Sequence, residues 1–154
     1  MLDFGTELES LLSALVGAKG DFAVCGGVAV AIHGVPRFTK DIDLLVPSAA
    51  TEAVLEVART CGFTLPAGPM DFDAGTARER HIRRISKIGT GQILTLDLIA
   101  VEPSFAEVWR SRQQVEWKGH LILVVSREGL GTMKRLSGRP QDRWDLVALG
   151  LEDT

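Results

Sequence analysis

Cysteine is scarce in this chain of 154 residues, which contains only Cys25 and Cys61. The two cysteines lie in separate segments and lack the Cys-x-x-Cys spacing of structural zinc sites and redox pairs, so neither kind of site is expected. A chain of this length buries roughly two thirds of its unfolded surface and needs no disulfide or structural metal to fold. Such cysteine usage is typical of a protein in a reducing cytoplasm.

Positive charge is not in excess either. Lys and Arg number 17 against 20 Asp and Glu, which leaves a net charge of −3 and a pI near 5.6. That balance provides no general attraction for a long nucleic acid. One dense basic run contains Arg78, Arg80, Arg83 and Arg84. We interpret it as the solvated edge of a hairpin, with contact to RNA or to a partner as the alternative.

The sequence also lacks a long hydrophobic run. Its longest uncharged stretch, from Phe22 to Pro36, includes two adjacent glycines and a histidine. It is shorter than the roughly 20 residues that a bilayer-spanning helix needs. The first ten residues are acidic, whereas a secretory signal begins with basic residues. We therefore expect a cytoplasmic protein with no membrane partner.

Hydrophobic periodicity divides the chain into alternating helices and strands. Helices are expected over residues 6–16, 28–33, 48–61, 104–112, 126–137 and 141–151, and strands over 22–25, 41–46, 81–88, 92–101, 115–117 and 120–125. Residues 63–76 are rich in Gly, Pro and Asp and are predicted to form an exposed loop. This order predicts an α/β or α+β fold, in which helices flank a mixed sheet and further helices follow at the C-terminus.

The length fits one domain over residues 1–154, with a core over about 20–125 and a C-terminal helical segment over about 126–154. The last helix is predicted to bury Trp144, Val147, Ala148 and Leu151. Trp109 and Trp117 are expected in the core as well.

Two acidic residues, Asp41 and Asp43, stand in an otherwise apolar strand. Side chains two residues apart on a strand point to the same face, so both carboxylates share one face while Ile42 and Leu44 point into the core. Like charges this close repel each other unless a cation lies between them. Carboxylate oxygens suit Mg²⁺, which also takes ligands from substrate phosphates.

A third carboxylate, Asp97, lies within the apolar strand Leu94–Ile99. An unpaired charge in such a strand costs several kcal/mol, so its presence there needs a reason. If this strand lies beside that of Asp41 and Asp43, three carboxylates converge as in two-metal phosphoryl-transfer sites.

A glycine pair, Gly26-Gly27, stands between the first expected strand and the helix that follows it. Glycines allow the backbone to approach a ligand closely, and the start of a helix offers free N–H groups to phosphate. The pair is therefore a candidate phosphate contact, and a tight turn is the alternative.

The sequence resembles the nucleotidyltransferase superfamily of the DNA polymerase β-like fold, in its minimal form. Its signature is a hydrophobic residue before Gly-Gly or Gly-Ser, then two acids flanking a hydrophobic residue, then a third acid on a later strand. The fuller pattern here is Gly26-Gly-x-Ala, His33-Gly, Arg37-x-Thr and Asp41-Ile-Asp, and it is similar to the small prokaryotic branch of stand-alone and toxin-type enzymes. The likeness covers residues 22–46, 92–101 and 121–151, the last of these with its Met133–Arg139 segment.

The resemblance implies a nucleotidyltransferase-like mixed sheet and transfer of a nucleoside monophosphate from a nucleoside triphosphate to an acceptor hydroxyl, with release of pyrophosphate. It implies Mg²⁺ as cofactor, two ions being expected with bound nucleotide. By the roles of the family, Asp41, Asp43 and Asp97 are catalytic and hold the metal, with Asp97 also a candidate base. The candidate nucleotide-binding residues are Gly26, Gly27, Arg37, Lys40 and Lys134.

Several of these assignments have alternatives. Arg37 and Lys40 are equally compatible with exposed loop charges. Lys134, with Arg135 and Arg139, lies near a helix end, where cations also suit the helix dipole. His33 is interpreted as a packed or capping histidine, with catalysis as the alternative.

Other functions remain as rivals. Glycosyltransferases and haloacid-dehalogenase-type phosphatases also present Asp-x-Asp, but neither class explains the glycine pair or Asp97. A non-catalytic module of the same fold, binding nucleotide or a partner protein, is a further alternative. So is the toxin half of a toxin–antitoxin pair, which would imply an antitoxin partner. The acceptor stays open between a small molecule, tRNA and a protein hydroxyl.

Overall fold

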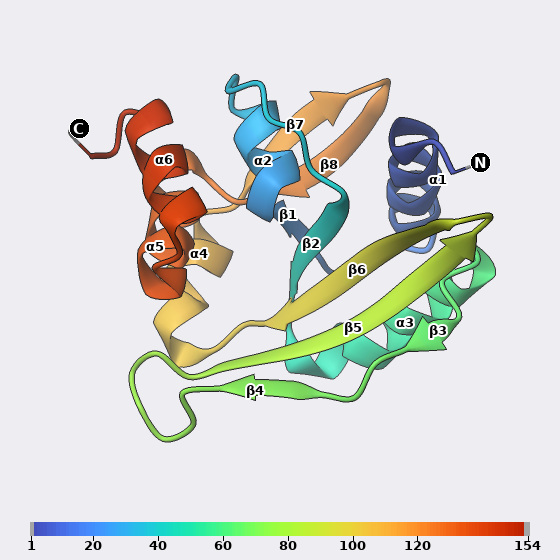
Figure 1. The fold of residues 1–154 in the computed structure, drawn as a ribbon, viewed down its shortest axis with the longest axis horizontal. Helices are drawn as coiled ribbons and strands as arrows, with labels where there is room; N and C mark the ends of the chain where they lie inside the picture. The colour runs from blue at the N-terminus through green and yellow to red at the C-terminus, as the bar shows by residue number, and fades with distance from the viewer. Residues whose placement is uncertain (1, 153–154) are drawn as a thin grey trace.

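A mixed sheet of eight strands, flanked by helices, organises residues 2–152, the part of the chain that the computed structural model describes (Figure 1). The helices are α1 (Phe4–Gly17), α2 (Gly26–Ile32), α3 (Thr51–Thr60), α4 (Ala106–Arg110), α5 (Arg127–Ser137) and α6 (Pro140–Ala148), with 3₁₀ turns η1 (Ser48–Ala50) and η2 (Pro103–Phe105). The strands are β1 (Ala23–Cys25), β2 (Asp41–Val46), β3 (Leu65–Pro66), β4 (Met70–Phe72), β5 (Arg80–Gly89), β6 (Gln92–Ala100), β7 (Gln113–Trp117) and β8 (His120–Val124).

The strand order is β3-β5-β6-β2-β1-β8-β7, and β4 pairs with β5 beyond β3. The pairs β2–β6 and β1–β8 are parallel, and the other pairs are antiparallel. The prediction of a mixed α/β sheet is therefore confirmed. Parallel pairing of β2 with β6 is possible because α3 and three strands separate them in the sequence.

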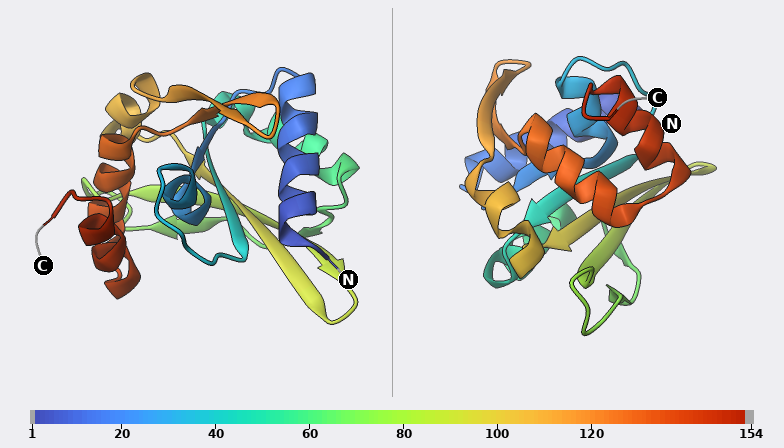
Figure 2. Two further views of the ribbon diagram at one scale, coloured as in Figure 1. Left: turned by 90° about the horizontal axis from the view of Figure 1, so that it is seen from above. Right: turned by 90° about the vertical axis from the view of Figure 1, so that its left-hand side faces the viewer.

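The helices gather at two ends of the molecule, with α1 at one end, α5 and α6 at the other and α2 between them (Figure 2). α1 packs against α3 and β8, while α2 packs against β1, β2 and α5. Fully buried leucines of α1, among them Leu11 and Leu15, join Ile42, Leu44 and Leu96 of the central strands in one core. Ile42 and Leu44 are buried while Asp41 and Asp43 stay accessible, as the alternation along β2 predicts.

Two local predictions are wrong. Residues 63–76, predicted as a loop, contain β3 and β4, which pair with β5 although their side chains are mostly exposed. β3 and β4 are held by backbone hydrogen bonds to β5, and because their side chains are mostly exposed, their sequences show no alternation of apolar and polar residues. The first helix begins at Phe4, because the Asp3 side chain accepts a hydrogen bond from the Thr6 N–H and caps the helix in place of the predicted Thr6.

The buried face of α6 also differs from the prediction. Trp144, expected in the core, is 71% exposed, whereas Asp142, Asp145 and Leu146 are buried. Trp109 and Trp117 do pack against the core. Hydrophobic periodicity assigns apolar residues to the inner face, but here two carboxylates turn inward because cations of the neighbouring segments pair with them.

No helix within residues 2–152 combines the length and the apolar character that crossing a membrane requires.

This orientation of α6 predicts unequal losses of stability for two nearby substitutions. Leu146→Ala should lower the free energy of unfolding by about 2–4 kcal/mol, because it leaves a cavity in the core. Trp144→Ala should change it by less than about 0.5 kcal/mol, since the indole is exposed. Urea unfolding of both variants measures the difference. A larger loss for Trp144→Ala would mean that α6 packs by its other face.

Candidate active site

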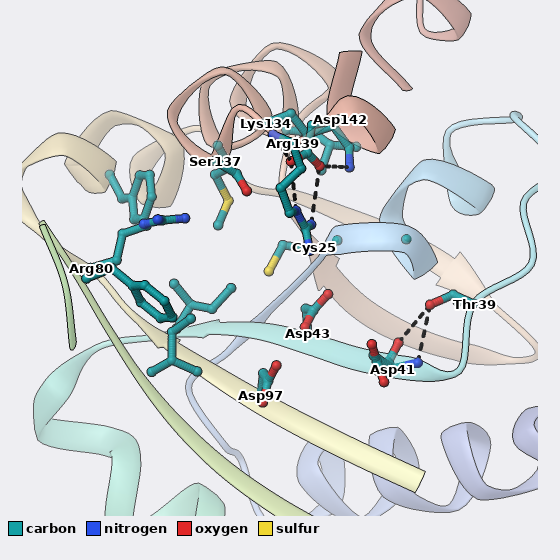
Figure 3. Close-up of a pocket in the computed structure, with 18 of the residues that line it drawn as sticks. Cys25, Thr39, Asp41, Asp43, Arg80, Asp97, Lys134, Ser137, Arg139 and Asp142 are labelled. Atoms are coloured by element: carbon teal, nitrogen blue, oxygen red, sulfur yellow. Dashed lines mark hydrogen bonds and ion pairs between the residues drawn. The ribbon is translucent and has the colours of Figure 1, made fainter. Parts of the chain in front are cut away.

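A row of polar side chains crosses the centre of the sheet on one face. Asp43 of β2 pairs in register with Asp97 of β6, which pairs in register with Arg84 of β5. Cys25 of β1 lies opposite Asp43 on its other side. Residues that are directly paired on neighbouring strands point to the same face. Figure 3 shows Asp43 and Asp97 directed into one space, as the sequence analysis predicted for their strands.

Asp41 lies further along β2, beside Thr39 (Figure 3). It pairs in register with Thr95, and its own backbone N–H and C=O both contact the Thr39 hydroxyl. Asp41 is exposed, whereas Asp97 is buried. The three predicted acids thus share one face, with Asp43 and Asp97 as the inner pair and Asp41 at the mouth.

Arg84 forms the closest counter-charge to these acids, and the sequence analysis had interpreted it as solvated. Its Nε donates to Asp97 Oδ1 at 2.8 Å and its Nη2 to Asp97 Oδ2 at 2.9 Å. This bidentate pair accounts for the otherwise costly acid in an apolar strand. The signal was present in the sequence, since Arg80, Ile82 and Arg84 alternate along β5 and so share one face.

The glycine pair is required by close packing against the site. Gly26 has φ +63°, and a Cβ built on it would lie 2.1 Å from Oδ2 of Asp43. A Cβ on Gly27 would lie 2.8 Å from Nη1 of Arg37 and 3.0 Å from Cβ of Thr39. A side chain at Gly26 would collide with Asp43, and one at Gly27 would require Arg37 and Thr39 to shift, so the groups that approach the backbone here belong to the site itself.

A cluster of cations from three segments faces the acids from above. Lys134 Nζ lies 2.7 Å from Asp145 Oδ2 and 3.4 Å from Asp142 Oδ1. Arg37 Nη1 lies 3.2 Å from the same Asp145 oxygen, and Arg139 Nε donates to Asp142 Oδ2 at 3.0 Å. The contacts of the Asp145 Oδ2 atom with Lys134 and Arg37 are ion pairs without hydrogen-bond geometry. The three cations outnumber the carboxylates of Asp142 and Asp145, so a net positive charge faces the three acids of the sheet.

Two of the predicted site residues, Lys134 and Lys40, have contrasting environments. Lys134 is almost fully buried, so its position near a helix end does not mark a solvated charge. Lys40 is exposed and faces a neighbouring pocket with Phe38 and Ile93. The structure therefore brings Gly26, Gly27, Arg37 and Lys134 to the site and leaves Lys40 outside it.

These groups line a cavity of about 500 Å³ between the sheet and α5. Its floor is the face that carries Asp41, Asp43 and Asp97. Its roof is one face of α5, formed by Leu130, Met133, Lys134 and Ser137, with Arg139 and Asp142 beyond. Spacings of three and four residues place side chains on one helix face. Arg80, Arg84, Arg139 and Asp142 belong to this cavity but were not predicted as site residues.

Burial raises the pKa of Asp43 to about 7, and the charges of Asp97 and then Asp41 add to the rise. Arg139 and Lys134 oppose this effect without cancelling it. Burial and the neighbouring carboxylates both favour the protonated form of Asp43, and a cation bound between the acids would favour the ionised form. Because all three donors are hard carboxylate oxygens, a divalent cation such as Mg²⁺ fits the site chemically.

A different group of metal-ligand type lies nearby. Among residues 2–152, Glu79, His81 and Glu102 are the three His, Cys, Asp or Glu residues whose ligand atoms all lie within 4.8 Å of one another. His81 alternates with Arg80 and Ile82 of the cavity, so it points to the opposite face of β5. The carboxylate oxygens of Asp41, Asp43 and Asp97 do not all lie within 4.8 Å of one another, so the three aspartates are more widely spread than the ligands of a single preformed site. His33 contacts the Val125 carbonyl through Nε2 at 2.8 Å, as a packed histidine.

The close approach of Gly26 to Asp43 predicts a steric effect. Gly26→Ala should lower the free energy of unfolding by about 1–3 kcal/mol more than Gly91→Ala. Gly91 is the matched control, because its φ is +68° and a Cβ there meets open space. Urea unfolding of both variants gives the comparison. Equal losses would mean that Asp43 moves aside without cost.

The raised pKa of Asp43 predicts a pH effect on the metal-free protein. The folded state binds this proton more tightly than the unfolded state, whose Asp43 has the ordinary value of 3.8. Stability should therefore fall as pH rises from about 4 to about 7, by about 1.4 kcal/mol for each unit of pKa difference. Asp43→Asn should lack this loss and exceed the wild type in stability near pH 8.

Urea unfolding in EDTA near pH 5 and near pH 8 tests this, with the wild type subtracted from Asp43→Asn so that other titrating groups cancel. A difference that does not change with pH would contradict the argument.

Comparison with known proteins relates this site to a family. The sequence profile of the family described as "Nucleotidyl transferase AbiEii toxin, Type IV TA system" matches residues 10–150. No curated protein sequence matches the chain at a significant level.

Solved structures share the fold. TM1012 of Thermotoga maritima, assigned to the nucleotidyltransferases, has a TM-score of 0.63 at 17% identity, over 91% of this chain and 88% of that one. The lincosamide antibiotic adenylyltransferase LnuA, solved with lincomycin, has a TM-score of 0.61 at 16% identity, over 96% and 97%. The antibiotic-resistance factor ANT(2'')-Ia has a TM-score of 0.62 at 16% identity, over 95% and 80%.

At these identities the structural likeness shows the fold alone. The assignment to a family rests on the sequence profile, which matches most of the chain. Taken with the glycine pair, the paired acids and the cations above them, it shows that the chain belongs to the nucleotidyl transferase AbiEii toxin family and is a nucleotidyltransferase.

Proposed function

We propose that this chain transfers a nucleoside monophosphate from a nucleoside triphosphate to an acceptor hydroxyl and releases pyrophosphate, in a reaction that depends on Mg²⁺. The observation that carries the proposal is the in-register pair of Asp43 and Asp97 below the cations Lys134, Arg37 and Arg139. Acids that bind a hard cation and cations that bind phosphate face each other across one cavity, as phosphoryl transfer requires.

We assign Asp41, Asp43 and Asp97 as the residues that would hold Mg²⁺, with two ions expected once nucleotide is bound. Asp97 is compatible with this role although Arg84 donates to both of its oxygens, because a carboxylate offers about four lone-pair sites. When bound, the ions would neutralise the carboxylates, lower the pKa of the acceptor hydroxyl and stabilise the leaving pyrophosphate.

The cation cluster is assigned to the β- and γ-phosphates. Lys134 and Arg37 are held in place by their common partner Asp145, so they are oriented before a ligand arrives. Preorganised charges of this kind act without reorganisation during the reaction. The backbone of Gly26 and Gly27 lines the same end of the cavity and completes the proposed triphosphate site.

The proposed chemistry is an in-line displacement at the α-phosphorus. The acceptor oxygen forms a bond to phosphorus, the bond from phosphorus to the bridging oxygen breaks, and pyrophosphate leaves with that electron pair. The hydroxyl proton passes to the Asp97 carboxylate, which Arg84 holds in a fixed orientation. A module that binds nucleotide without turnover is the alternative, and the presence of all three acids supports catalysis over it.

The acceptor is proposed as a class only. The family's description as a toxin of a type IV toxin–antitoxin system supports a cellular target, such as tRNA or a protein hydroxyl, and an antitoxin partner. LnuA is an adenylyltransferase of lincosamide antibiotics, and ANT(2'')-Ia has been solved with adenylyl-2''-tobramycin, which supports a small hydroxyl compound as acceptor. All of these acceptors would use the same three acids.

The assignment of Asp43 predicts a loss of activity that is separate from folding. Asp43→Asn keeps the side-chain volume and removes the charge, so transfer should fall by at least about a hundredfold. The assay incubates the protein with labelled nucleoside triphosphates, Mg²⁺ and cell extract, and follows label in the product.

Asp21→Asn is the matched control, because Asp21 is exposed and lies outside the cavity. Asp145 cannot serve as a control, since it is buried against Lys134 and Arg37. Full activity of a folded Asp43→Asn variant would remove Asp43 from the site.

A further inference from the structure

Four side chains of metal-ligand type meet outside the cavity, where β4 leads into β5. His81 of β5 points to the face opposite the cavity, and Asp71, its in-register partner on β4, shares that face. Glu79 directly precedes β5, and Glu102 lies two residues beyond the end of β6. Figure 1 shows the connection between β4 and β5 as a loop at this end of the sheet. We call Asp71, Glu79, His81 and Glu102 the histidine cluster.

The imidazole of His81 is held in one orientation by Asp71. Its Nδ1 atom lies 2.6 Å from Oδ1 of Asp71, which accepts a hydrogen bond from the Nδ1–H group. A neutral imidazole that donates from Nδ1 carries its lone pair on Nε2. A carboxylate on the far ring nitrogen orients metal-binding histidines in the same way. Asp71 therefore presents Nε2 of His81 as a ligand atom.

Two glutamates flank this Nε2 atom without forming a hydrogen bond to it. Nε2 lies 3.7 Å from Oε1 of Glu79 and 3.7 Å from Oε1 of Glu102, beyond the length of a hydrogen bond. Two ligand atoms on one tetrahedral zinc ion are roughly 3.4 Å apart, because each bond measures about 2.0–2.1 Å. All three ligand atoms lie within 4.8 Å of one another. The spacing therefore suits an ion between these atoms.

The histidine cluster is also short of positive charge. Within residues 2–152, none of its three carboxylates forms an ion pair with a lysine or an arginine, and His81 is the one group of opposite sign that all three approach. Even a protonated imidazole would leave two negative charges in excess. The side chain of Glu102 is only 14% exposed, so water compensates its charge incompletely. A divalent cation would balance the histidine cluster.

We propose that Glu79, His81 and Glu102 bind a divalent transition-metal ion of the zinc type, while Asp71 orients the imidazole. An imidazole nitrogen together with carboxylates suits Zn²⁺, whereas Mg²⁺ takes oxygen ligands. Three protein ligands leave one position for water. The site uses no cysteine, so cysteine spacing gives no indication of it. Because it lies on the other face of β5 from the three aspartates, this ion is distinct from the proposed Mg²⁺.

An ion at this place would tie the connection between β4 and β5 to the sheet. Glu79 ends that connection and accepts a hydrogen bond from the Gly75 N–H at 3.2 Å. Arg78, its neighbour, donates to the carbonyl of Leu136 in α5, the helix that roofs the cavity. Glu102 leads into η2 and α4. The role of the ion is therefore structural, since it joins segments around one end of the cavity.

The test titrates the full chain with ZnCl₂ by calorimetry near pH 7.5, without nucleotide, and measures the melting temperature with and without zinc. The hydrogen bond to Asp71 raises the pKa of His81, and a proton on Nε2 competes with the metal, so a lower pH is avoided. We expect the wild type to bind zinc and to melt at a higher temperature with it. X-ray absorption of the zinc complex should show nitrogen and oxygen ligands without sulfur.

His81→Gln removes the imidazole and should weaken zinc binding by at least about a hundredfold, while Asp71→Asn, which changes only the group behind the ligand, should weaken it by about 10- to 100-fold. His120→Gln is the matched control, because His120 lies on β8 outside the histidine cluster, and it should bind zinc as the wild type does. Both cysteines and the three aspartates stay intact in all of these variants, so zinc bound at those residues would not produce the difference.

The inference is overturned if the wild type binds no zinc, if a sulfur ligand appears, or if zinc raises the melting temperature of His81→Gln as much as that of the wild type. The last result would mean that His81 makes ion pairs only. If His81→Gln does not fold, Glu79→Gln takes its place, since that side chain is 36% exposed and its loss should also weaken zinc binding. None of these outcomes bears on nucleotidyl transfer, which is proposed for the other face of β5.

Discussion

The parallel pairing of β2 with β6 brings the carboxylates of Asp43 and Asp97 side by side, and the repulsion between them shapes their surroundings. Two acids on adjacent strands are tolerated because Arg84 pairs with one of them and burial keeps the proton on the other up to about pH 7. The same repulsion makes the site suited to a divalent cation. The Asp43 carboxylate also accounts for the glycine at position 26, since it occupies the space that a Cβ would need there.

The C-terminal helices place positive charge opposite the negative charge of the sheet. α5 turns Lys134 inward over the acids, and α6 turns Asp142 and Asp145 inward to meet it. Asp145 also pairs with Arg37, which comes from the segment between α2 and β2. Buried ion pairs are costly to break, so these contacts hold α5, α6 and that segment in one orientation around the cavity. The proposed phosphate ligands and the packing of α5 against α6 therefore depend on the same side chains.

The cavity that results has ends of opposite character. Its floor carries Asp41 at one end, then Asp43, Asp97 and Arg84 in one row, and then Ile82 and Ile99 in the next row. This order follows from the strand register, because each step of two residues along β5 and β6 replaces one row of side chains by the next.

The sequence by itself determined the elements and the acids. The alternation of Asp41 and Asp43 with buried neighbours, and the unusual position of Asp97, follow from periodicity along single strands, which is a local property. Tertiary structure decided three features that the sequence did not show: the pairing of β4 with β5, the buried face of α6 and the ion pair between Asp97 and Arg84. Each of these depends on a partner distant in the chain, and a charge that is exposed by local criteria becomes buried only when that partner is present.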